Sequence, residues 1–543
     1  MTSSSMSKAL FALCLFLPAS ALASAQLASH AGWISIMPPL IAIALALWFK
    51  QVIPALFAGV WMGAWAINGG NLKALWTGLL DTFQVYILGA LANPDHAAIV
   101  LFSLMVGGMV GIISRNGGMH GIVKRIINWV DSARHATIAT YILGFSIFFD
   151  DYANTLVVGN TMRPVADRMR VSRAKLAYIV DSTAAPIAAV AIVTTWIGAE
   201  VAYIGDALSQ TGYATESAYM LFLRTIPYSF YPLLTLLFVG MIAFNRRDFG
   251  PMLRAEIAAL DQTPAKLASV KSEDLINPLA NKPQRAINAV IPVLVLVGSL
   301  IAGLIATGEG DTLKDIIGSS NSYTALMWAS LLGVVAATIL SIGQKILSLE
   351  QVVESWVSGA KVIMLAMIIL ILAWALGKTT ESLNTASYLI SIMGDSFPLW
   401  LLPTLVFVLA AATAFATGSS WGTMGILMPL VVPLSFALLH NNGVSHAIDS
   451  SILVATIAGV LGGAVWGDHC SPISDTTILS SMATGCNHIE HVRTQLPYAL
   501  LVGGVAIAAG TIPAGFGVQW WLSLLVGSIL LIIIYRVFTK PVE

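Results

Sequence analysis

Apolar runs about twenty residues long recur along this chain, and they constrain its fold more than any other feature. The runs Ile287–Ile305 and Phe516–Tyr535 are two of them, and a helix of that length crosses a hydrocarbon core of roughly 30 Å. Only 10% of the 543 residues are charged and 57% are hydrophobic, whereas soluble domains carry about 25% charged residues. Lipid leaves backbone polar groups to be satisfied within the chain, so the sequence predicts an all-α polytopic membrane protein.

A polar segment separates two hydrophobic halves. Residues 245–286 carry several Lys and Arg side chains, so the positive-inside rule predicts a cytoplasmic linker. The first half then covers 34–244, the second 287–512, and residues 513–543 supply one extra C-terminal span. We predict spans at 34–49, 52–68, 98–114, 176–200, 219–243, 287–306, 324–343, 361–377, 450–484, 495–511 and 516–535. Residues 70–97 and 344–360 are less apolar, and we expect them at the membrane interface.

The N-terminus resembles a secretory signal peptide over residues 1–25. Lys8 precedes the apolar stretch Ala9–Ala21, and Ala23-Ser24-Ala25 follows as a small-residue cleavage site. The alternative is an uncleaved first helix. Three scattered cysteines do not form a disulfide framework.

The two halves repeat each other at an offset of about 270 residues, as internal duplications in transporters do. Phe148–Thr155 matches Ala416–Thr423, with Gly418-Ser419-Ser420 in place of an acidic pair. Basic flanks around Ala136–Met162 favour a re-entrant hairpin tipped by Asp150-Asp151, and Trp400–Leu438 is its counterpart. We therefore predict two inverted repeats of about five spans each, with re-entrant hairpins and broken helices, as in secondary transporters.

Residues 466–477 combine two carboxylates and several hydroxyls with Gly467 and Pro472. Such an unwound polar backbone occurs at membrane depth only inside protein or along a wet cavity, and ionisable groups there are functional candidates. Oxygen ligands suit hard cations, and carboxylates also hold protons, so Asp468 and Asp475 are the predicted Na⁺ ligands. The candidate ion- or substrate-binding residues are Asp468, Ser471, Ser474, Asp475, Thr476, Asp150, Asp151, Asn154, Ser419 and Ser420.

Several residues have a structural alternative. Asp150-Asp151 can cap the hairpin turn, and Asp181 can be the N-cap of a helix. Glu200 is either a site residue or part of an external loop. Cys486-x-His488-x-x-His491 has approximate metal-ligand spacing, but we expect it in a solvated cytoplasmic loop.

The chain resembles the NhaC family of Na⁺/H⁺ antiporters over residues 35–510. The resemblance is carried by Phe149–Asn154, by Asp181–Pro186 and above all by Gly467–Thr477, which fits the pattern Gly-Asp-x-x-Ser-Pro-[Leu/Ile]-Ser-Asp-Thr-Thr. It implies Na⁺/H⁺ exchange in the plasma membrane. The family also includes members that exchange organic acids such as malate and lactate, or that carry amino acids. The resemblance therefore leaves the substrate open.

The leading hypothesis is a secondary antiporter that exchanges cytoplasmic Na⁺ for external protons in the bacterial inner membrane. The second is a Na⁺-coupled carrier of small organic acids or amino acids, and a remote third is an intramembrane metalloenzyme using the His/Cys segment. No nucleotide-binding motif supports an ATP-driven pump, and we expect no cofactor. The expected partners are the lipid bilayer and the transported Na⁺, H⁺ or organic solute. A homodimer is compatible with this architecture, and zero net charge gives no sign of a nucleic-acid partner.

Overall fold

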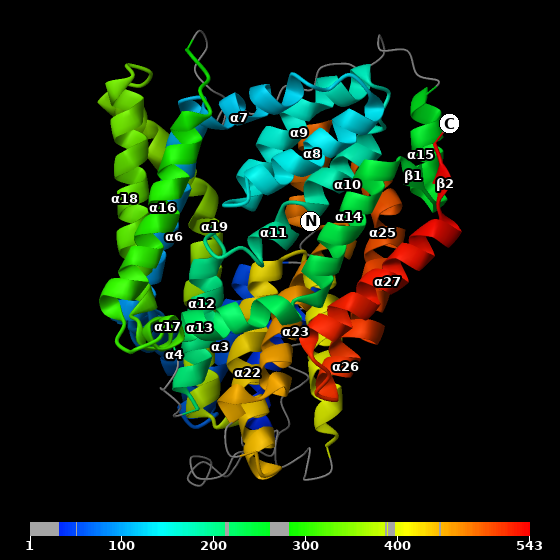
Figure 1. The fold of residues 1–543 in the computed structure, drawn as a ribbon. Coiled ribbons are helices and arrows are strands. Elements are labelled where there is room, and N and C mark those ends of the chain that lie inside the picture. Colours follow the sequence, from blue (N-terminus) through cyan, green and yellow to red (C-terminus); the bar gives the residue numbers. More distant parts are fainter. Residues whose placement is uncertain are drawn as a thin grey trace, which may run out of the picture.

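The fold is a bundle of helices, seen in a computed structural model (Figure 1). The structure describes residues 32–49, 51–211, 217–260, 282–385, 388, 397–444 and 447–542. The predicted signal peptide lies outside these residues.

The first half is mainly helical, with a non-helical segment at residues 189–196. The long helix α6 (Pro94–Arg115) and the bent pair α13–α14 are spans, whereas the helices around residue 150 are short. The remaining helices are α2 (Met37–Phe49), α3 (Val52–Ile67), α4 (Leu72–Asp81), α5 (Leu88–Ala92), α7 (Gly118–Ile127), α8 (Ala133–Ser146), α9 (Asp151–Arg168), α10 (Arg173–Ser182), α11 (Ala185–Ala188), α12 (Ile197–Ser209), α13 (Ala218–Thr225) and α14 (Phe230–Asn245).

The second half has longer helices. It contains α16 (Ile287–Thr307), α17 (Leu313–Ser319), α18 (Ser322–Gly343), α19 (Leu349–Ser382), α21 (Leu402–Thr417), α22 (Ser420–Asn441), α23 (Ser451–Cys470), α24 (Asp475–Thr484), α25 (His488–Val505), α26 (Ile512–Gly515) and α27 (Trp520–Phe538). In Figure 1, α16 and α18 lie at one side of the bundle and α27 at the other.

Ten helices in the described part of the chain are long and apolar enough to cross a membrane, or eleven if the bent pair α13–α14 is one span. The polytopic all-α prediction is therefore confirmed. The interfacial prediction for residues 70–97 does not fit the structure, whereas the one for residues 344–360 stays a prediction. Leu72–Ala92 is one helix with the length and composition of a span, continued through a π-helical segment at Thr82–Ile87. Residues 349–360 form the first part of the 34-residue helix α19.

The predicted span 176–200 is not one helix. α10 ends at Ser182, the short α11 follows, and α12 begins at Ile197. The predicted span 450–484 is also broken, because residues 471–474 separate α23 from α24. Pro472 explains that break, since proline removes a backbone donor and disfavours a helical residue before it.

Two helix pairs carry the predicted hairpin tips. α8 and α9 pack together and join through residues 147–150, while α21 and α22 pack together and join at Gly418-Ser419. The second pair differs from the predicted re-entrant hairpin in length, because Leu399–Thr417 and Ser420–Asn441 are each long enough to span. In Figure 1 α8 and α9 lie in the upper half and α22 in the lower half.

Glycines let α21 and α23 pack closely. A Cβ at Gly463 would lie 2.4 Å from the Phe407 carbonyl oxygen, and one at Gly467 would lie 2.1 Å from the Ala411 carbonyl oxygen. Small residues at such crossings bring helix backbones together in membrane bundles. This crossing holds the C-terminal end of α23, which carries Asp468, against α21.

The first part of the linker packs against the helix bundle. After β1 (Arg247–Asp248), which pairs with β2 (Lys540–Pro541), the helix α15 (Gly250–Leu260) packs on α10 and α25. Lys175 is fully buried, with its Nζ 2.7 Å from Asp248 Oδ2 and 3.3 Å from Glu256 Oε2. Residues 261–281 of the predicted linker lie outside the described residues.

Candidate functional site

Asp150 and Asp151 open α9 and are both buried. Asp150 is the N-cap, and its Oδ1 accepts a hydrogen bond of 2.6 Å from the Ala153 N–H. Neither oxygen of Asp151 has a hydrogen-bond partner among the described residues. The capping alternative therefore applies to Asp150, and Asp151 is the carboxyl group left available for a ligand.

Asn154 fastens the tip of the first pair. Its Nδ2 donates to the carbonyl oxygens of Gly144 (2.8 Å) and Thr183 (3.0 Å), which tie α9 to α8 and to the end of α10. Its Oδ1 has no partner in the described part of the chain, and neither has the hydroxyl of the next residue, Thr155. The tip thus combines rigid backbone anchoring with unpaired oxygens.

The break between α23 and α24 holds the second acidic pair. Asp468 lies in the last turn of α23, and its Oδ2 accepts a 2.6 Å hydrogen bond from Thr476 Oγ1. Its Oδ1 is unpartnered within the described residues. Asp475 begins α24, where its Oδ1 accepts from the Thr476 N–H at 2.8 Å and its Oδ2 accepts from the Tyr152 hydroxyl. The two breaks therefore meet through Tyr152, a residue that the sequence prediction omitted.

The predicted hydroxyl ligands of this break have structural partners as well. Ser471 Oγ donates to the Phe415 carbonyl oxygen at 2.7 Å, which ties the break to α21. Ser474 is the N-cap of α24 and lies 3.0 Å from Thr476 Oγ1. These contacts hold Asp468 and Asp475 on a defined backbone.

The second hairpin tip repeats the cap of the first. Ser419 is the N-cap of α22 and accepts from the Gly422 N–H, with φ −146° and ψ 117° against −156° and 124° at Asp150. Ser420, the first residue of α22, is buried. Gly418 has φ 69°, and a Cβ there would lie 2.5 Å from the Ile473 carbonyl oxygen. Glycine is thus required both for the left-handed turn and for the close approach of this tip to the break.

Four helix N-termini form a closed ring around the site. Thr195 N donates to the Phe149 carbonyl oxygen at 2.9 Å, which joins the starts of α9 and α12. The Trp196 and Trp421 rings, 5.8 Å apart, join α12 to α22. Gly418 against Ile473 joins α22 to α24, and Tyr152 with Asp475 closes the ring at α9. Helix N-termini carry partial positive charge, so this ring stabilises anionic groups without a cationic side chain.

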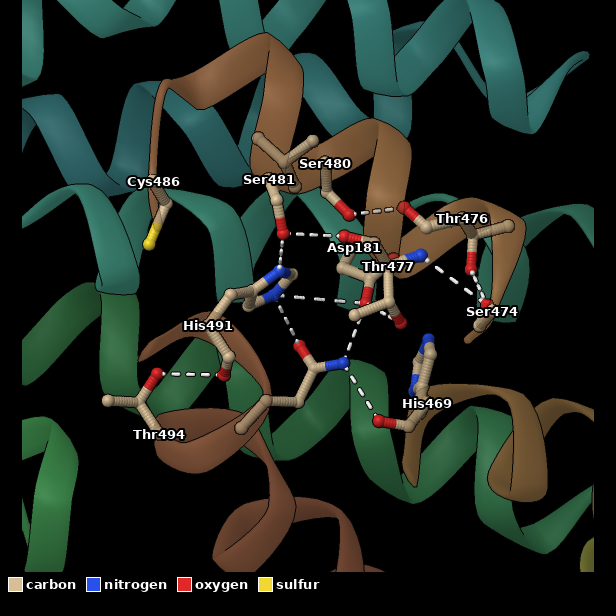
Figure 2. Close-up of polar contacts among 12 residues, drawn as sticks. Asp181, His469, Ser474, Thr476, Thr477, Ser480, Ser481, Cys486, His491 and Thr494 are labelled. Carbon is tan, nitrogen blue, oxygen red and sulfur yellow. Dashed lines mark hydrogen bonds and ion pairs between the residues drawn. The ribbon is translucent and has the colours of Figure 1, made fainter. Parts of the chain in front are cut away.

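Asp181 belongs to a neighbouring network that the sequence prediction missed. It lies in the last turn of α10, fully buried, and is not the N-cap suggested above. Its Oδ2 accepts from Gln495 Nε2 at 2.6 Å and from Thr477 Oγ1 at 3.3 Å (Figure 2). His491 Nε2 lies 3.9 Å from the same oxygen.

The solvated-loop prediction for the His/Cys segment is wrong for His491. Its side chain is fully buried in α25, and Cys486 is also buried. Within the described ranges no group of three or more His, Cys, Asp or Glu side chains is placed to hold a metal ion. The external-loop alternative for Glu200 is wrong too, because this residue is fully buried in α12.

Four buried carboxyl groups, those of Asp150, Asp151, Asp181 and Asp468, thus lie in one connected region with the half-buried Asp475. In the part of the chain that the structure describes, these carboxyl groups form no hydrogen bond or ion pair with a Lys or Arg side chain. Burying a charge is costly unless it is paired, and otherwise the group takes up a proton or coordinates a cation. By this rule the carboxyl groups of the site are candidates for proton or cation binding.

Comparisons with known proteins agree with that chemistry. A model of the Na⁺/H⁺ antiporter family matches residues 188–515, more than half of the chain. An uncharacterized protein of Haemophilus influenzae is 33% identical over 490 residues, which cover 89% of this chain and 91% of that protein. The malate-2H⁺/Na⁺-lactate antiporter of Bacillus subtilis is 32% identical over 99 residues, 18% of each chain.

The crystal structure of the Alcanivorax borkumensis YdaH transporter has a similar fold. It covers 82% of this chain and 90% of its own, with a TM-score of 0.52 and 14% identity. The NhaC-type resemblance seen in the motifs is confirmed, and the family is one of transporters rather than enzymes. The chain belongs to the Na⁺/H⁺ antiporter family.

Proposed function

We propose that the protein is a secondary antiporter that exchanges cytoplasmic Na⁺ for external protons. The observation that carries the proposal is the set of buried carboxyl groups with no Lys or Arg partner. Asp151 and Asp468 carry oxygens without hydrogen-bond partners among the described residues, and these oxygens are free to bind Na⁺. Asp475 and Thr476 complete the proposed shell, because Thr476 contacts both acidic residues of the break.

Exchange follows from competition for one site. A carboxylate that binds Na⁺ cannot hold a proton on the same oxygen, so each cation released allows a proton to bind. If the site faces only one side of the membrane at a time, this competition gives antiport. No further energy source is required beyond the two ion gradients.

Two inverted repeats are the proposed means of alternating access. The matching caps at Asp150 and Ser419 support this, and so does the cross-packing of α9 on α24 and of α12 on α22. Lys124 and Arg125 lie in the last turn of α7, at the upper end of Figure 1, and the positive-inside rule favours a cytoplasmic position for that end. The proposed location is the bacterial inner membrane.

The second candidate is a Na⁺-coupled carrier of small organic acids. Its support is the local likeness to the malate-lactate antiporter together with the ring of four helix N-termini, which suits a substrate carboxylate. In that case Na⁺ binds beside the acid, and flux depends on both.

Reconstitution in liposomes distinguishes the two. With a pH-sensitive dye inside and an imposed pH difference, Na⁺ alone should move protons through the wild-type protein and not through the Asp468→Asn variant. Proton movement that requires lactate or malate in addition to Na⁺ establishes the second candidate. A fully active Asp468→Asn variant refutes the assignment of the site.

A further inference from the structure

A buried histidine, His491, connects the site region to the protein surface. His491 and Gln495 lie one helical turn apart on α25 and face Asp181 on α10, and all three side chains are fully buried. His491 Nε2 is 3.0 Å from Gln495 Oε1, and His491 Nδ1 is 2.9 Å from Ser481 Oγ; Figure 2 shows His491 between Ser481 and Asp181. His491 has no part in the Na⁺ site proposed above.

The hydrogen bonds of Gln495 determine that Nε2 of the His491 ring carries a hydrogen. Gln495 Nε2 donates to Asp181 Oδ2 at 2.6 Å and to the His469 carbonyl oxygen at 3.0 Å, which uses both of its hydrogens. Its Oε1 can only accept, so the hydrogen between the two side chains belongs to His491 Nε2. The ring is therefore protonated on the side that faces Asp181.

The other ring nitrogen of His491, Nδ1, can be hydrogen-bonded both with and without a proton. Ser481 has one hydroxyl hydrogen and two close acceptors, the Thr477 carbonyl oxygen at 2.7 Å and His491 Nδ1 at 2.9 Å, with His488 Nδ1 farther away at 3.2 Å. When the hydroxyl donates to His491, the imidazole is neutral. When it donates to Thr477, His491 Nδ1 must supply its own hydrogen, and the ring is an imidazolium 3.9 Å from Asp181. Both protonation states of His491 are hydrogen-bonded without any movement of heavy atoms.

The chain of contacts has one end at the surface. His488 Nδ1 is 3.2 Å from Ser481 Oγ, and its Nε2 is 2.7 Å from the Pro472 carbonyl oxygen in a partly exposed position. A cavity of about 150 Å³, lined in part by Asn487 and the exposed Glu490, opens beside the same turn of α25. Solvent protons thus reach the first turn of α25.

The other end points toward the proposed Na⁺ site. Thr477, which donates to Asp181 Oδ2, follows Thr476 in the first turn of α24, and Thr476 donates to Asp468. Asp181 Oδ1 has no partner among the described residues. Two consecutive residues of α24, Thr476 and Thr477, therefore belong respectively to the ion site and to the histidine network.

The charged and titratable groups around His491 leave Asp181 as its proton acceptor. On α15 and α10, Glu256 and Lys175 are paired with each other, and on α24 the only acid is Asp475, which is held by Tyr152. α23 carries Asp468, which accepts from Thr476, and His469, whose Nδ1 lies 3.0 Å from the Tyr231 hydroxyl on α14. Arg173 on α10 is paired with Asp167, and Cys486 lies in the preceding loop. α25 itself carries His488, the exposed Glu490 and Tyr498, which donates to Asp248.

We propose that His488, Ser481, His491 and Asp181 form the path by which protons pass between the cytoplasmic face and the buried carboxyl groups. As a proton bonds to His491 Nδ1 through Ser481, the His491 Nε2–H bond breaks and its hydrogen bonds to Gln495 Oε1. At the same time a Gln495 Nε2–H bond breaks and that hydrogen bonds to Asp181 Oδ2, so one proton enters the unit and one leaves it. The inference rests on the proposed antiport, because it assigns the route of the proton in that exchange.

The test compares two fluxes through the same reconstituted protein. Na⁺-driven proton movement reports the complete exchange, whereas exchange of ²²Na⁺ for Na⁺ at equal pH reports Na⁺ binding and alternating access alone. His491→Gln should lower the proton flux by roughly 100-fold, the scale of a positioned proton-transfer group, and leave Na⁺/Na⁺ exchange unchanged. His135→Gln is the matched control, since His135 pairs with Asp131 at an exposed position and should leave both fluxes unchanged.

His488→Gln and Ser481→Ala keep the test decisive if His491→Gln does not fold. Each should slow the proton flux selectively, and imidazole added on the cytoplasmic side should restore part of the flux in His488→Gln. An unchanged proton flux in these variants overturns the path, and so does an equal loss of both fluxes. A wild-type protein that exchanges ²²Na⁺ but moves no protons with Na⁺ contradicts the proposed antiport instead.

Discussion

Asp150 and Asp151 are adjacent acids for which the structure predicts opposite responses to the same change. Asp150 accepts the Ala153 N–H at 2.6 Å as the cap of α9, and an asparagine oxygen accepts the same hydrogen bond. Asp151 has no hydrogen-bond partner in the described part of the chain. Asp150→Asn should therefore preserve Na⁺-driven proton flux, and Asp151→Asn should abolish most of it.

The magnitudes follow from those contacts. Asparagine and aspartate are near-equal caps, whereas Asp150→Ala removes the cap and costs about 1 kcal/mol. Asp151→Asn breaks no hydrogen bond of the fold and relieves repulsion among neighbouring carboxylates, so the melting temperature should stay the same or rise. A contact to a charged group contributes about 1.5–3 kcal/mol. Loss of the proposed contact between Na⁺ and the Asp151 carboxylate should therefore raise the Na⁺ concentration for half-maximal flux roughly 10- to 150-fold.

The assay is Na⁺ titration of proton flux in liposomes, with the melting temperature of each purified variant measured with and without Na⁺. Na⁺ should raise the melting temperature of the wild type and of Asp150→Asn, because a ligand that binds the native state stabilises it. It should not do so for Asp151→Asn. Normal Na⁺ dependence in Asp151→Asn, with loss of flux in Asp150→Asn, would refute the reasoning.

Two further predictions concern the scaffold. Gly463→Ala should destabilise the protein, because its Cβ would lie 2.4 Å from the Phe407 carbonyl oxygen, whereas Gly504→Ala, with no atom within 4 Å of its Cβ, should gain up to about 1 kcal/mol from helix propensity. Equal melting temperatures for these two variants contradict the close α21–α23 crossing. Lys175→Met should cost about 3–5 kcal/mol by leaving Asp248 and Glu256 without their buried cation. Lys378→Met, at an exposed pair, should change the melting temperature little, and a similar result for Lys175→Met would show that the linker is not anchored through this contact.

The α23–α24 break could be predicted from the sequence because its signal is local. Pro472, Gly467 and the hydroxyl residues follow directly after an apolar stretch, and the same residues form the break in the structure. Helix length was less predictable. Asn71 caps a helix that runs through a π-helical segment to Ala92, and its scattered polar residues hid its overall apolar character.

The Asp181 network could not be predicted because its members lie far apart in the sequence. Which face of α25 meets α10 is decided by tertiary packing, and only that packing brings Gln495 to Asp181. One local signal was available. Asn487 caps the first turn of α25 and accepts from the Glu490 N–H, a pattern of an N-cap followed by Glu that marks a helix start. Recognising it would have placed His491 and Gln495 one turn apart on a helix rather than in a loop.

The position of each acid on its helix indicates how charge is divided within the site. Asp150, Asp151 and Asp475 stand at helix N-termini, where partial positive charge stabilises a carboxylate. Asp468 and Asp181 stand in C-terminal turns, where a negative charge is destabilised.

Four N-termini at about half a charge each supply roughly two positive charges to the ring, fewer than the carboxyl groups present. Asp181 has its own counter-charge in His491 whenever that ring is protonated. Asp468 has no such partner, since its Oδ2 accepts only from a neutral hydroxyl. In the proposed antiport its negative charge is therefore the one that a proton or Na⁺ compensates at every stage of transport, and this requirement would couple the two ions.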